Sequence, residues 1–356
     1  MKRISRIFVR KLIIFAKVML DVTFTHCSDL NPMVQDVIAR HRKSPYFEMF
    51  EVLETDDGEL EYETFRMICS IPKFATESFK TISFIANDFV KKWMRLGVDA
   101  WRLDVANEIS DNMLDNIKHV IKDEKKEIYV VGEIWHNATE WISNNALDSI
   151  TNYAVSRAIL AFVCDSTHDI FKYRSAIDEL IHSYTKKQLK ASIPLLDSHD
   201  TPRLRTIVHN DKDKFKLALL LLFTFYGTPS LYYGTERYME GAGDPDNRRP
   251  TNWDDHGADV EDIYHITKLL IQLRHDHPVL ANDGELEWID HNELLIMHRY
   301  NDTENLYIII NSKEYDLDTA LPMNMDYINI IDHCPISNSI HINRLGSLIL
   351  KPKSYT

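Results

Sequence analysis

Glycine, cysteine and concentrated positive charge are scarce in this sequence of 356 residues. The ten glycines make up about 3% of the chain, where globular proteins average roughly 7%. Six of them fall in or near the sequence motifs that suggest a function: Gly97, Gly132, Gly227, Gly234, Gly241 and Gly243. The four cysteines show no Cys-x-x-Cys pair and no metal-ligand spacing, which indicates reduced, intracellular thiols. With 44% hydrophobic and 27% charged residues, the composition excludes a fibrous or a disordered protein.

The charge balance and the apolar runs exclude two further classes of protein. Asp and Glu outnumber Lys and Arg by 54 to 41, and no long basic stripe exists, so we expect no nucleic-acid partner. No apolar run approaches the ~20 residues that span a bilayer, so we expect no membrane partner. Residues 1–22 begin like a secretory signal, but Lys17 interrupts the apolar run and no cleavage site follows. We expect a helix end followed by a strand there, and a cytoplasmic protein.

Short apolar runs alternate with longer helical patterns through the first 280 residues. This alternation is typical of βα units around a parallel sheet, so the predicted fold class is α/β. The expected strands are 18–24, 99–105, 128–135, 148–154, 192–198 and 229–234, and the expected helices are 78–95, 108–124, 167–184, 212–224 and 257–275.

The sequence pattern changes near residue 280. From Glu285 onward, short alternating segments are separated by Asn, Asp, Ser and Pro turns, with no long helical pattern between them. We therefore predict a catalytic domain over 1–279, with an inserted loop region at about 27–78, and a C-terminal β-sandwich domain over 280–356.

Charged and imidazole side chains cluster at the carboxyl ends of the expected strands: Asp21, His26, Arg102, Asp104, Glu133, His199 and Asp200. In a (β/α) barrel these ends converge on one face, where the active site forms. Three carboxylates without a Ser or Cys nucleophile or a phosphate-binding loop favour acid/base chemistry on a neutral polar substrate. Glycoside hydrolysis needs this set, because one carboxylate attacks or activates water and a carboxylic acid protonates the leaving oxygen. At this level the role of each carboxylate stays open.

Four motifs in this sequence resemble those of a known enzyme family. Asp21-Val-Thr-Phe-Thr-His26, Gly97-Val-Asp-Ala-Trp-Arg102-Leu-Asp104-Val-Ala-Asn107-Glu108, Gly132-Glu133-Ile-Trp135-His136 and Ser198-His199-Asp200-Thr-Pro-Arg203 resemble, in order, the four sequence regions of the α-amylase family of glycoside hydrolases. Ile71-Pro-Lys-Phe-Ala-Thr76 and Asp244-Pro-Asp-Asn-Arg-Arg-Pro250 resemble its neopullulanase, cyclomaltodextrinase and maltogenic amylase subgroup.

The resemblance implies a (β/α)8-type TIM barrel and a role for each motif residue. Asp104 corresponds to the nucleophile, Glu133 to the general acid/base, and Asp200 to the residue that binds sugar hydroxyls and stabilises the transition state. The substrate-binding set implied is His26, Arg102, His199, Trp135, Asp244 and Arg248. Structural support is implied for Asp21 and Asn107. The family retains anomeric configuration, so the carboxyl groups of Asp104 and Glu133 are expected roughly 5–5.5 Å apart.

The other interpretation of each residue is a structural one. A carboxylate at a strand end also serves as a helix cap or a surface charge. The aromatic rings of Trp101, Trp135, Tyr232 and Tyr233 suit a packed core as well as a sugar-binding surface.

The sequence also departs from the family pattern. Thr25 and Ala75 stand where the family usually has asparagine, and the first of these ligates calcium in many relatives, so we predict no metal and no cofactor. Only 20 residues precede Asp21, where the family has two βα units and, in this subgroup, an N-terminal β-domain. We therefore expect an N-terminally truncated barrel of about six strands.

Such a barrel has open edges, so we expect a homodimer or a complementing N-terminal fragment as partner. The predicted function is retaining hydrolysis of α-glucosidic bonds in maltooligosaccharides, cyclodextrins or pullulan. The alternative is an inactive fragment or carbohydrate-binding remnant of such an enzyme.

Overall fold

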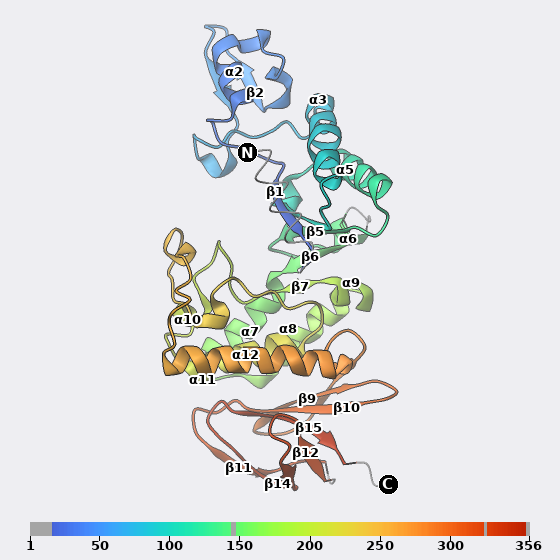
Figure 1. Cartoon of the computed structure of the whole chain (residues 1–356), viewed down its shortest axis with the longest axis vertical. Coiled ribbons are helices and arrows are strands. Elements are labelled where there is room, and N and C mark those ends of the chain that lie inside the picture. The colour runs from blue at the N-terminus through green and yellow to red at the C-terminus, as the bar shows by residue number, and fades with distance from the viewer. Residues whose placement is uncertain (1–15, 144–146, 324–325, 354–356) are drawn as a thin grey trace. The chain divides into compact units, whose positions relative to one another are not determined.

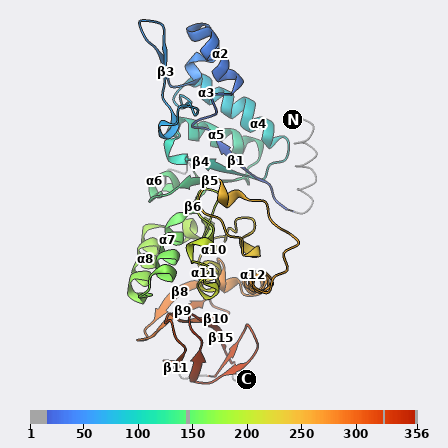
Figure 2. The same ribbon diagram turned by 90° about the vertical axis from the view of Figure 1, so that its left-hand side faces the viewer.

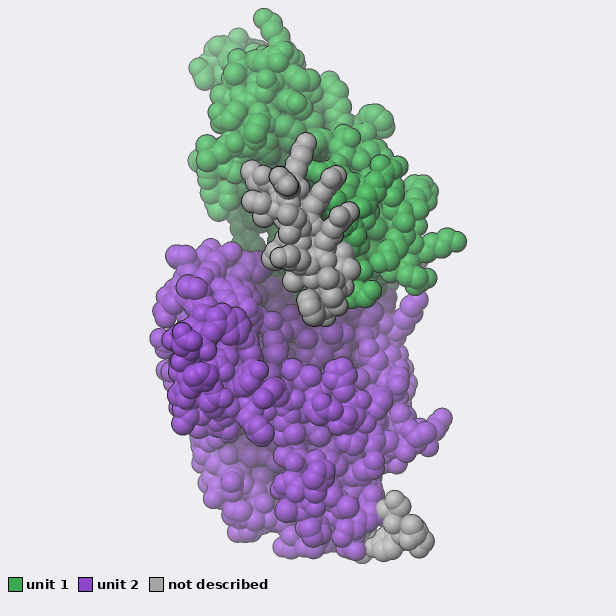
Figure 3. Space-filling view, in the orientation of Figure 1, with its two compact units in different colours: residues 1–151 green, residues 152–356 purple. Residues whose placement is uncertain are grey.

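The computed structural model describes residues 16–143, 147–323 and 326–353 and divides into two compact units, coloured separately in Figure 3. Unit 1 comprises residues 1–151 and unit 2 comprises residues 152–356. The helix end expected near the N-terminus falls mostly on residues 1–15, outside the described residues.

Unit 1 is built on parallel strands in the order β1-β4-β5-β6. Their bounds are β1 (Met19–Thr23), β4 (Ala100–Asp104), β5 (Tyr129–Ile134) and β6 (Ser149–Asn152). Strand β4 pairs in parallel with β1 on one side and with β5 on the other. All of β4 except its last residue is buried, as is β5 after its first residue, which suits strands covered on both faces. Four of the expected strands are confirmed.

Helices accompany this sheet at the two predicted stretches, 78–95 and 108–124, and α6 (Thr139–Ser143) is a further short helix that the sequence pattern did not predict (Figure 1). Helix α3 (Phe79–Ser83), the π-helical turn η4 (Phe84–Val90) and α4 (Lys91–Met94) form one continuous stretch, and α5 (Asp111–Glu124) and α6 follow. The Ser110 hydroxyl caps α5 by accepting a hydrogen bond from the Met113 amide at 3.3 Å. Met113, Leu114, Ile117 and Ile121 form its buried stripe.

The segment between β1 and α3 has an apolar core of its own. It contains α2 (Pro32–Arg40), the short turns η1 (His41–Lys43), η2 (Phe47–Met49) and η3 (Phe65–Met67), and the hairpin of β2 (Val52–Glu54) with β3 (Leu60–Tyr62). Its buried side chains are Val34, Val37, Met49, Phe50 and Phe74. The region predicted as an inserted loop is therefore a folded insertion.

Unit 2 begins with helices. They are α7 (Tyr153–Cys164), α8 (Ile170–Ser183), α9 (Lys186–Ala191), α10 (Leu204–Ile207), α11 (Lys212–Thr224) and α12 (Ala258–Asp276), with the turns η6 (Thr235–Arg237), η7 (Asp246–Arg248) and η8 (Pro278–Leu280). Helix α11 is buried along most of its length, and α12 lies beside it in both ribbon views (Figures 1 and 2).

Three expected strands are shorter than predicted. The strand expected to reach residue 154 ends at Asn152, whose side chain accepts from the Val155 amide and so caps α7. Strand β7 is only Ile193–Pro194, and the strand expected at 229–234 is reduced to one parallel bridge between Leu195 and Ser230. Proline at 194 and at 229 removes backbone donors, which prevents a longer ladder at these positions.

The C-terminal part of unit 2 is antiparallel β-structure. Strands β8 (Glu285–Ile289), β9 (Leu294–Tyr300), β10 (Asn305–Asn311), β12 (Tyr327–Asn329), β13 (Pro335–Ile336) and β15 (Ser347–Pro352) form a six-stranded sheet in the order β13-β12-β15-β10-β9-β8. Strands β11 (Leu317–Ala320) and β14 (Ser339–Ile342) form a second sheet. Ile296, Ile309 and Leu350 of the first sheet share one apolar cluster with Leu317 and Ile342 of the second.

Among the residues that the structure describes, no helix combines the length and the apolar character needed to cross a bilayer.

Candidate active site

Arg102 and Asp104 lie two residues apart on β4, and the side chains of this strand alternate between its two faces. Trp101 and Leu103 are fully buried on one face, and the period of two turns Arg102 and Asp104 to the other. The parallel register places Arg102 opposite Asp21 of β1. The core interpretation of Trp101 is correct, since its indole nitrogen lies 3.1 Å from the Met94 sulfur.

One guanidinium joins three carboxylates. Arg102 Nη1 lies 2.6 Å from Asp21 Oδ1 and 2.7 Å from Asp104 Oδ1, and its Nη2 lies 3.0 Å from Glu133 Oε1. Burial by itself would lower the pKa of Arg102, but Asp21, Glu133 and Asp104 outweigh it and raise the pKa above its usual range. Arg102 therefore stays charged and neutralises part of an acidic cluster.

Glu133 is the most enclosed of these carboxylates, at 3% exposure. Its Oε1 accepts a hydrogen bond from the Trp135 indole N–H at 2.9 Å, and its Oε2 accepts from the Val105 amide at 3.3 Å. Val105 has a φ of 45°, a left-handed conformation that is strained for a β-branched residue and that turns the chain directly after Asp104. Trp135 remains 40% exposed, so its ring is open to a ligand.

His26 belongs to the same electrostatic environment. Its ring stacks on Phe65 with centroids 4.0 Å apart, and its Nδ1 lies 2.9 Å from the Thr25 hydroxyl. Burial lowers the pKa of His26, and the carboxylates of Asp104 and Glu108 offset only part of that effect. A neutral imidazole beside Asp104 is suited to hydrogen bonding with a sugar hydroxyl.

Unit 2 carries a second group of predicted site residues. His199 Nε2 lies 3.1 Å from Asp200 Oδ2, and Arg248 Nη2 lies 3.5 Å from Asp200 Oδ1. Arg248 Nε in turn contacts Asp244 Oδ1 at 3.0 Å. These four side chains are partly exposed, and the structure brings them together although 44 residues separate Asp200 from Asp244.

The remaining predicted residues have mainly structural surroundings. Asp21 contacts Arg102, as a support residue would, and its side chain is half exposed. Asn107 is half-buried in the turn η5 (Ala106–Glu108) directly after β4. In the described part of the chain, no group of three or more His, Cys, Asp or Glu side chains is arranged to hold a metal ion.

Sequence reasoning missed three buried polar residues of unit 2: Asp197, Arg203 and Asn247. Arg203 and Asn247 lie inside two of the motifs given above. The motifs therefore pointed to these positions, but the sequence did not show that their side chains are buried. Arg203 is fully buried, with its guanidinium 3.9 Å from the centre of the Tyr232 ring and its Nε donating to the Asn247 carbonyl at 2.8 Å. Tyr232 therefore has a packing role in addition to any contact with substrate.

Asp197 is buried, and two groups donate hydrogen bonds to its carboxylate. Its carboxylate accepts from the Leu204 amide at 2.9 Å and from the Thr235 hydroxyl. Burial raises the pKa of Asp197 to about 6, although these hydrogen bonds and Arg203 act in the opposite direction. Asp197 thus ties the segment after β7 to the turn η6.

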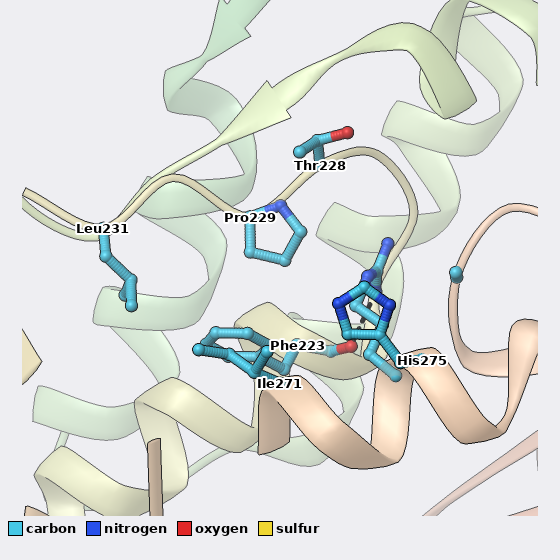
Figure 4. Close-up of a pocket in the computed structure, with 8 residues that line it drawn as sticks. Phe223, Thr228, Pro229, Leu231, Ile271 and His275 are labelled. Atoms are coloured by element: carbon cyan, nitrogen blue, oxygen red, sulfur yellow. Dashed lines mark hydrogen bonds between the residues drawn. The ribbon is translucent and has the colours of Figure 1, made fainter. Parts of the chain in front are cut away.

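The structure contains two cavities that neither Asp104 nor Glu133 lines. A cavity of about 380 Å³ in unit 1 borders β1 and is lined by Asp21 and by apolar side chains such as Phe84. A cavity of about 400 Å³ in unit 2 is lined by Phe223 of α11 and Ile271 of α12, together with Pro229 and Leu231 (Figure 4). Neither is lined by Asp104 or Glu133, and their apolar walls do not suit acid/base chemistry.

The motif order and the geometry agree with comparison against known proteins. The family model described as alpha amylase, catalytic domain, matches residues 14–278. The chain belongs to the α-amylase family. The TIM-barrel class, with a parallel sheet followed by antiparallel sheets, is thereby confirmed.

Curated relatives of this family resemble the chain over most of its length. It is 33% identical over 313 residues to the maltogenic alpha-amylase of Bacillus acidopullulyticus, covering 86% of this chain and 53% of the relative. It is 32% identical over 276 residues to neopullulanase 2 of Thermoactinomyces vulgaris, covering 76% and 47%. A solved cyclomaltodextrinase superposes with a TM-score of 0.88 at 28% identity, covering 98% of this chain and 63% of that one. The chain spans about half the length of the curated relatives it matches.

Proposed function

We propose that this α-amylase family member is a retaining glycoside hydrolase that cleaves α-glucosidic bonds of maltooligosaccharides, cyclodextrins or pullulan. The observation that carries the proposal is the contact of one buried guanidinium with both Asp104 and Glu133. Double displacement at a sugar carbon uses two carboxyl groups that lie close together, one as nucleophile and one as acid/base. The shared contact with Arg102 keeps Asp104 and Glu133 close together.

In this proposal Asp104 attacks the anomeric carbon and forms a covalent glycosyl-enzyme. Arg102 contacts Asp104 at 2.7 Å and so holds the attacking carboxylate in a fixed position. Glu133 protonates the leaving oxygen and then removes a proton from the incoming water. A second sugar can replace that water, so transglycosylation is expected as a side reaction.

The other motif residues bind the sugar. Asp200 hydrogen-bonds sugar hydroxyls and stabilises the oxocarbenium-like transition state, and Asp244 and Arg248 contact the glucan. His26 and His199 hydrogen-bond hydroxyls at the cleavage point. The exposed ring of Trp135 offers an apolar surface to a sugar face while its indole N–H stays on Glu133.

The test is hydrolysis of β-cyclodextrin by the purified chain, followed as released reducing ends and as the anomer formed. We expect turnover with retention, and its loss in Asp104→Asn and in Glu133→Gln. Asp123→Asn, an exposed change on α5, serves as the matched control and should leave the rate unchanged. A folded, monodisperse chain that binds maltooligosaccharide without turnover would instead support the carbohydrate-binding remnant.

We also propose that a complementing N-terminal segment, or a second copy of the chain, completes the enzyme. In the described residues β1 stands at the end of its sheet, and the apolar cavity of unit 1 borders it. An open strand edge beside apolar side chains favours the addition of another strand. Addition of the polypeptide encoded directly upstream should then raise activity, whereas unchanged activity and size would contradict the proposal.

We propose a cytoplasmic location. The four cysteines are free, and three of them are exposed, which suits a reducing compartment. Fractionation of cells producing the chain tests this, and recovery outside the cell would contradict it.

A further inference from the structure

Asn247 spans the backbone on both sides of Asp200. It lies in the turn η7, and its side chain is fully buried. Its amide nitrogen donates to the carbonyl oxygen of His199 at 2.7 Å and to that of Thr201 at 2.9 Å. The Ser198 carbonyl lies farther from the same nitrogen, at 3.5 Å, and the two hydrogens of the amide serve the two shorter bonds. One buried group thus holds the backbone carbonyls of the residues before and after Asp200.

Neighbouring groups also hold the backbone of Asn247 in place. Its own carbonyl accepts from Arg203 Nε at 2.8 Å, and the Arg203 amide donates to the Gly241 carbonyl at 2.9 Å. A Cβ on Gly241 would come within 2.7 Å of the Asn247 Cα, so the backbone there is closely packed. The amide therefore projects from a rigid support, which a positioning group requires.

The same turn also reaches the side chain of Asp200. Arg248, the next residue, lies 3.5 Å from Asp200 Oδ1 and 3.0 Å from Asp244 Oδ1. Turn η7 thus contacts Asp200 by two routes, through its flanking backbone and through its carboxylate.

We propose that Asn247 is a positioning residue that sets the location of the Asp200 carboxylate. The inference rests on the proposed function, in which Asp200 stabilises the transition state. Misplacement of such a group by about 1 Å costs up to ~100-fold in rate. Loss of the Asn247 amide therefore lowers kcat, whereas KM depends on many other sugar contacts and changes little.

The sharpest substitution is Asn247→Asp, which keeps the shape and replaces the donating nitrogen with an oxygen that faces two carbonyls. Asn247→Asp buries an oxygen that repels these carbonyls, which can destabilise the whole fold. Asn247→Ala is therefore the second variant, because it removes the donors without adding charge. Asn252→Asp is the matched control. Asn252 is exposed five residues away and uses only its Oδ1, as acceptor for the Asp254 amide, which aspartate reproduces.

Two readouts test the proposal on the full chain, and folding is checked by circular dichroism. Hydrogen exchange should rise in residues 198–204 of both Asn247 variants and stay unchanged elsewhere and in Asn252→Asp. On β-cyclodextrin, kcat should fall by about 10- to 100-fold with KM within about threefold.

Three results would overturn the proposal: unchanged exchange in 198–204, increased exchange throughout the chain, or local exchange without a fall in kcat of an active chain. If the unmodified chain shows no turnover, the proposed function fails by itself. The exchange measurement still decides whether Asn247 holds the Asp200 segment.

Discussion

Replacing Asp197 with asparagine should make the protein more stable at neutral pH. The carboxyl group is buried, and its pKa is raised to about 6 from an ordinary value of 3.8 because burial penalises the charge. Between these two values the folded chain holds a proton that the unfolded chain has released. Stability contributed by this group is therefore present below about pH 4 and is lost as the pH rises through about 6. A shift of about 2 pH units corresponds to roughly 3 kcal/mol.

Asparagine stays neutral and can keep both contacts of Asp197. Its oxygen can accept from the Leu204 amide, and its nitrogen can donate to the Thr235 hydroxyl oxygen. Urea unfolding from pH 4 to pH 8 should show similar stability at pH 4 and an advantage of Asp197→Asn of up to about 3 kcal/mol above pH 7. Exposed Asp123→Asn loses only a surface contact with His119 and should change the free energy of unfolding by under about 0.5 kcal/mol across this pH range. A pH-independent difference, or a less stable variant at pH 7, would show that the buried charge of Asp197 does not lower the stability of the folded chain.

Two further substitutions test the packing of each unit by urea unfolding. Arg102→Met leaves the buried Glu133 carboxylate without its cation and should lower the free energy of unfolding by about 3–5 kcal/mol, whereas exposed Arg95→Met should cost under about 1 kcal/mol. Equal effects would contradict the proposed role of the cation. Gly227 has a φ of 87°, and the Cβ of Gly227→Ala would press against the Ser192 carbonyl. Gly58 has a similar φ of 83°, but open space surrounds it. Gly227→Ala should therefore lower the free energy of unfolding by roughly 1–3 kcal/mol more than Gly58→Ala does. A Gly227→Ala variant as stable as Gly58→Ala would contradict this prediction, because the backbone near residue 227 would then have shifted to make room for the Cβ.

The sequence allowed prediction of features that depend on local pattern. The apolar runs at β1, β4 and β5 predicted strands of a parallel sheet, and the motif residues Arg102, Asp104 and Glu133 were expected at the ends of these strands. Alternation along β4 then brings Arg102 and Asp104 onto one face, so their contact follows from spacing.

Contacts between segments far apart in the sequence could not be predicted in the same way. The bonds of Asn247 to the peptides around Asp200 depend on how the turn η7 folds back across about 45 residues, and no periodicity encodes that. The raised pKa of Asp197 depends on complete burial, which a polar residue in a Leu-Asp-Ser segment does not reveal. The early end of β6 was readable from Asn152 as a helix cap, but the apolar residues after it favoured a longer strand.

The central claim, that Asp104 is the nucleophile and Glu133 the acid/base, is tested most directly by trapping the glycosyl-enzyme. Fluoride leaves without a proton donor, so Glu133→Gln incubated with α-maltosyl fluoride should complete the first step. Without a base for water, it should then accumulate the ester. We expect mass spectrometry to find one maltosyl unit on the peptide that contains Asp104, and none after the further change Asp104→Asn. A folded chain that forms no adduct, or carries it on another residue, would contradict the account.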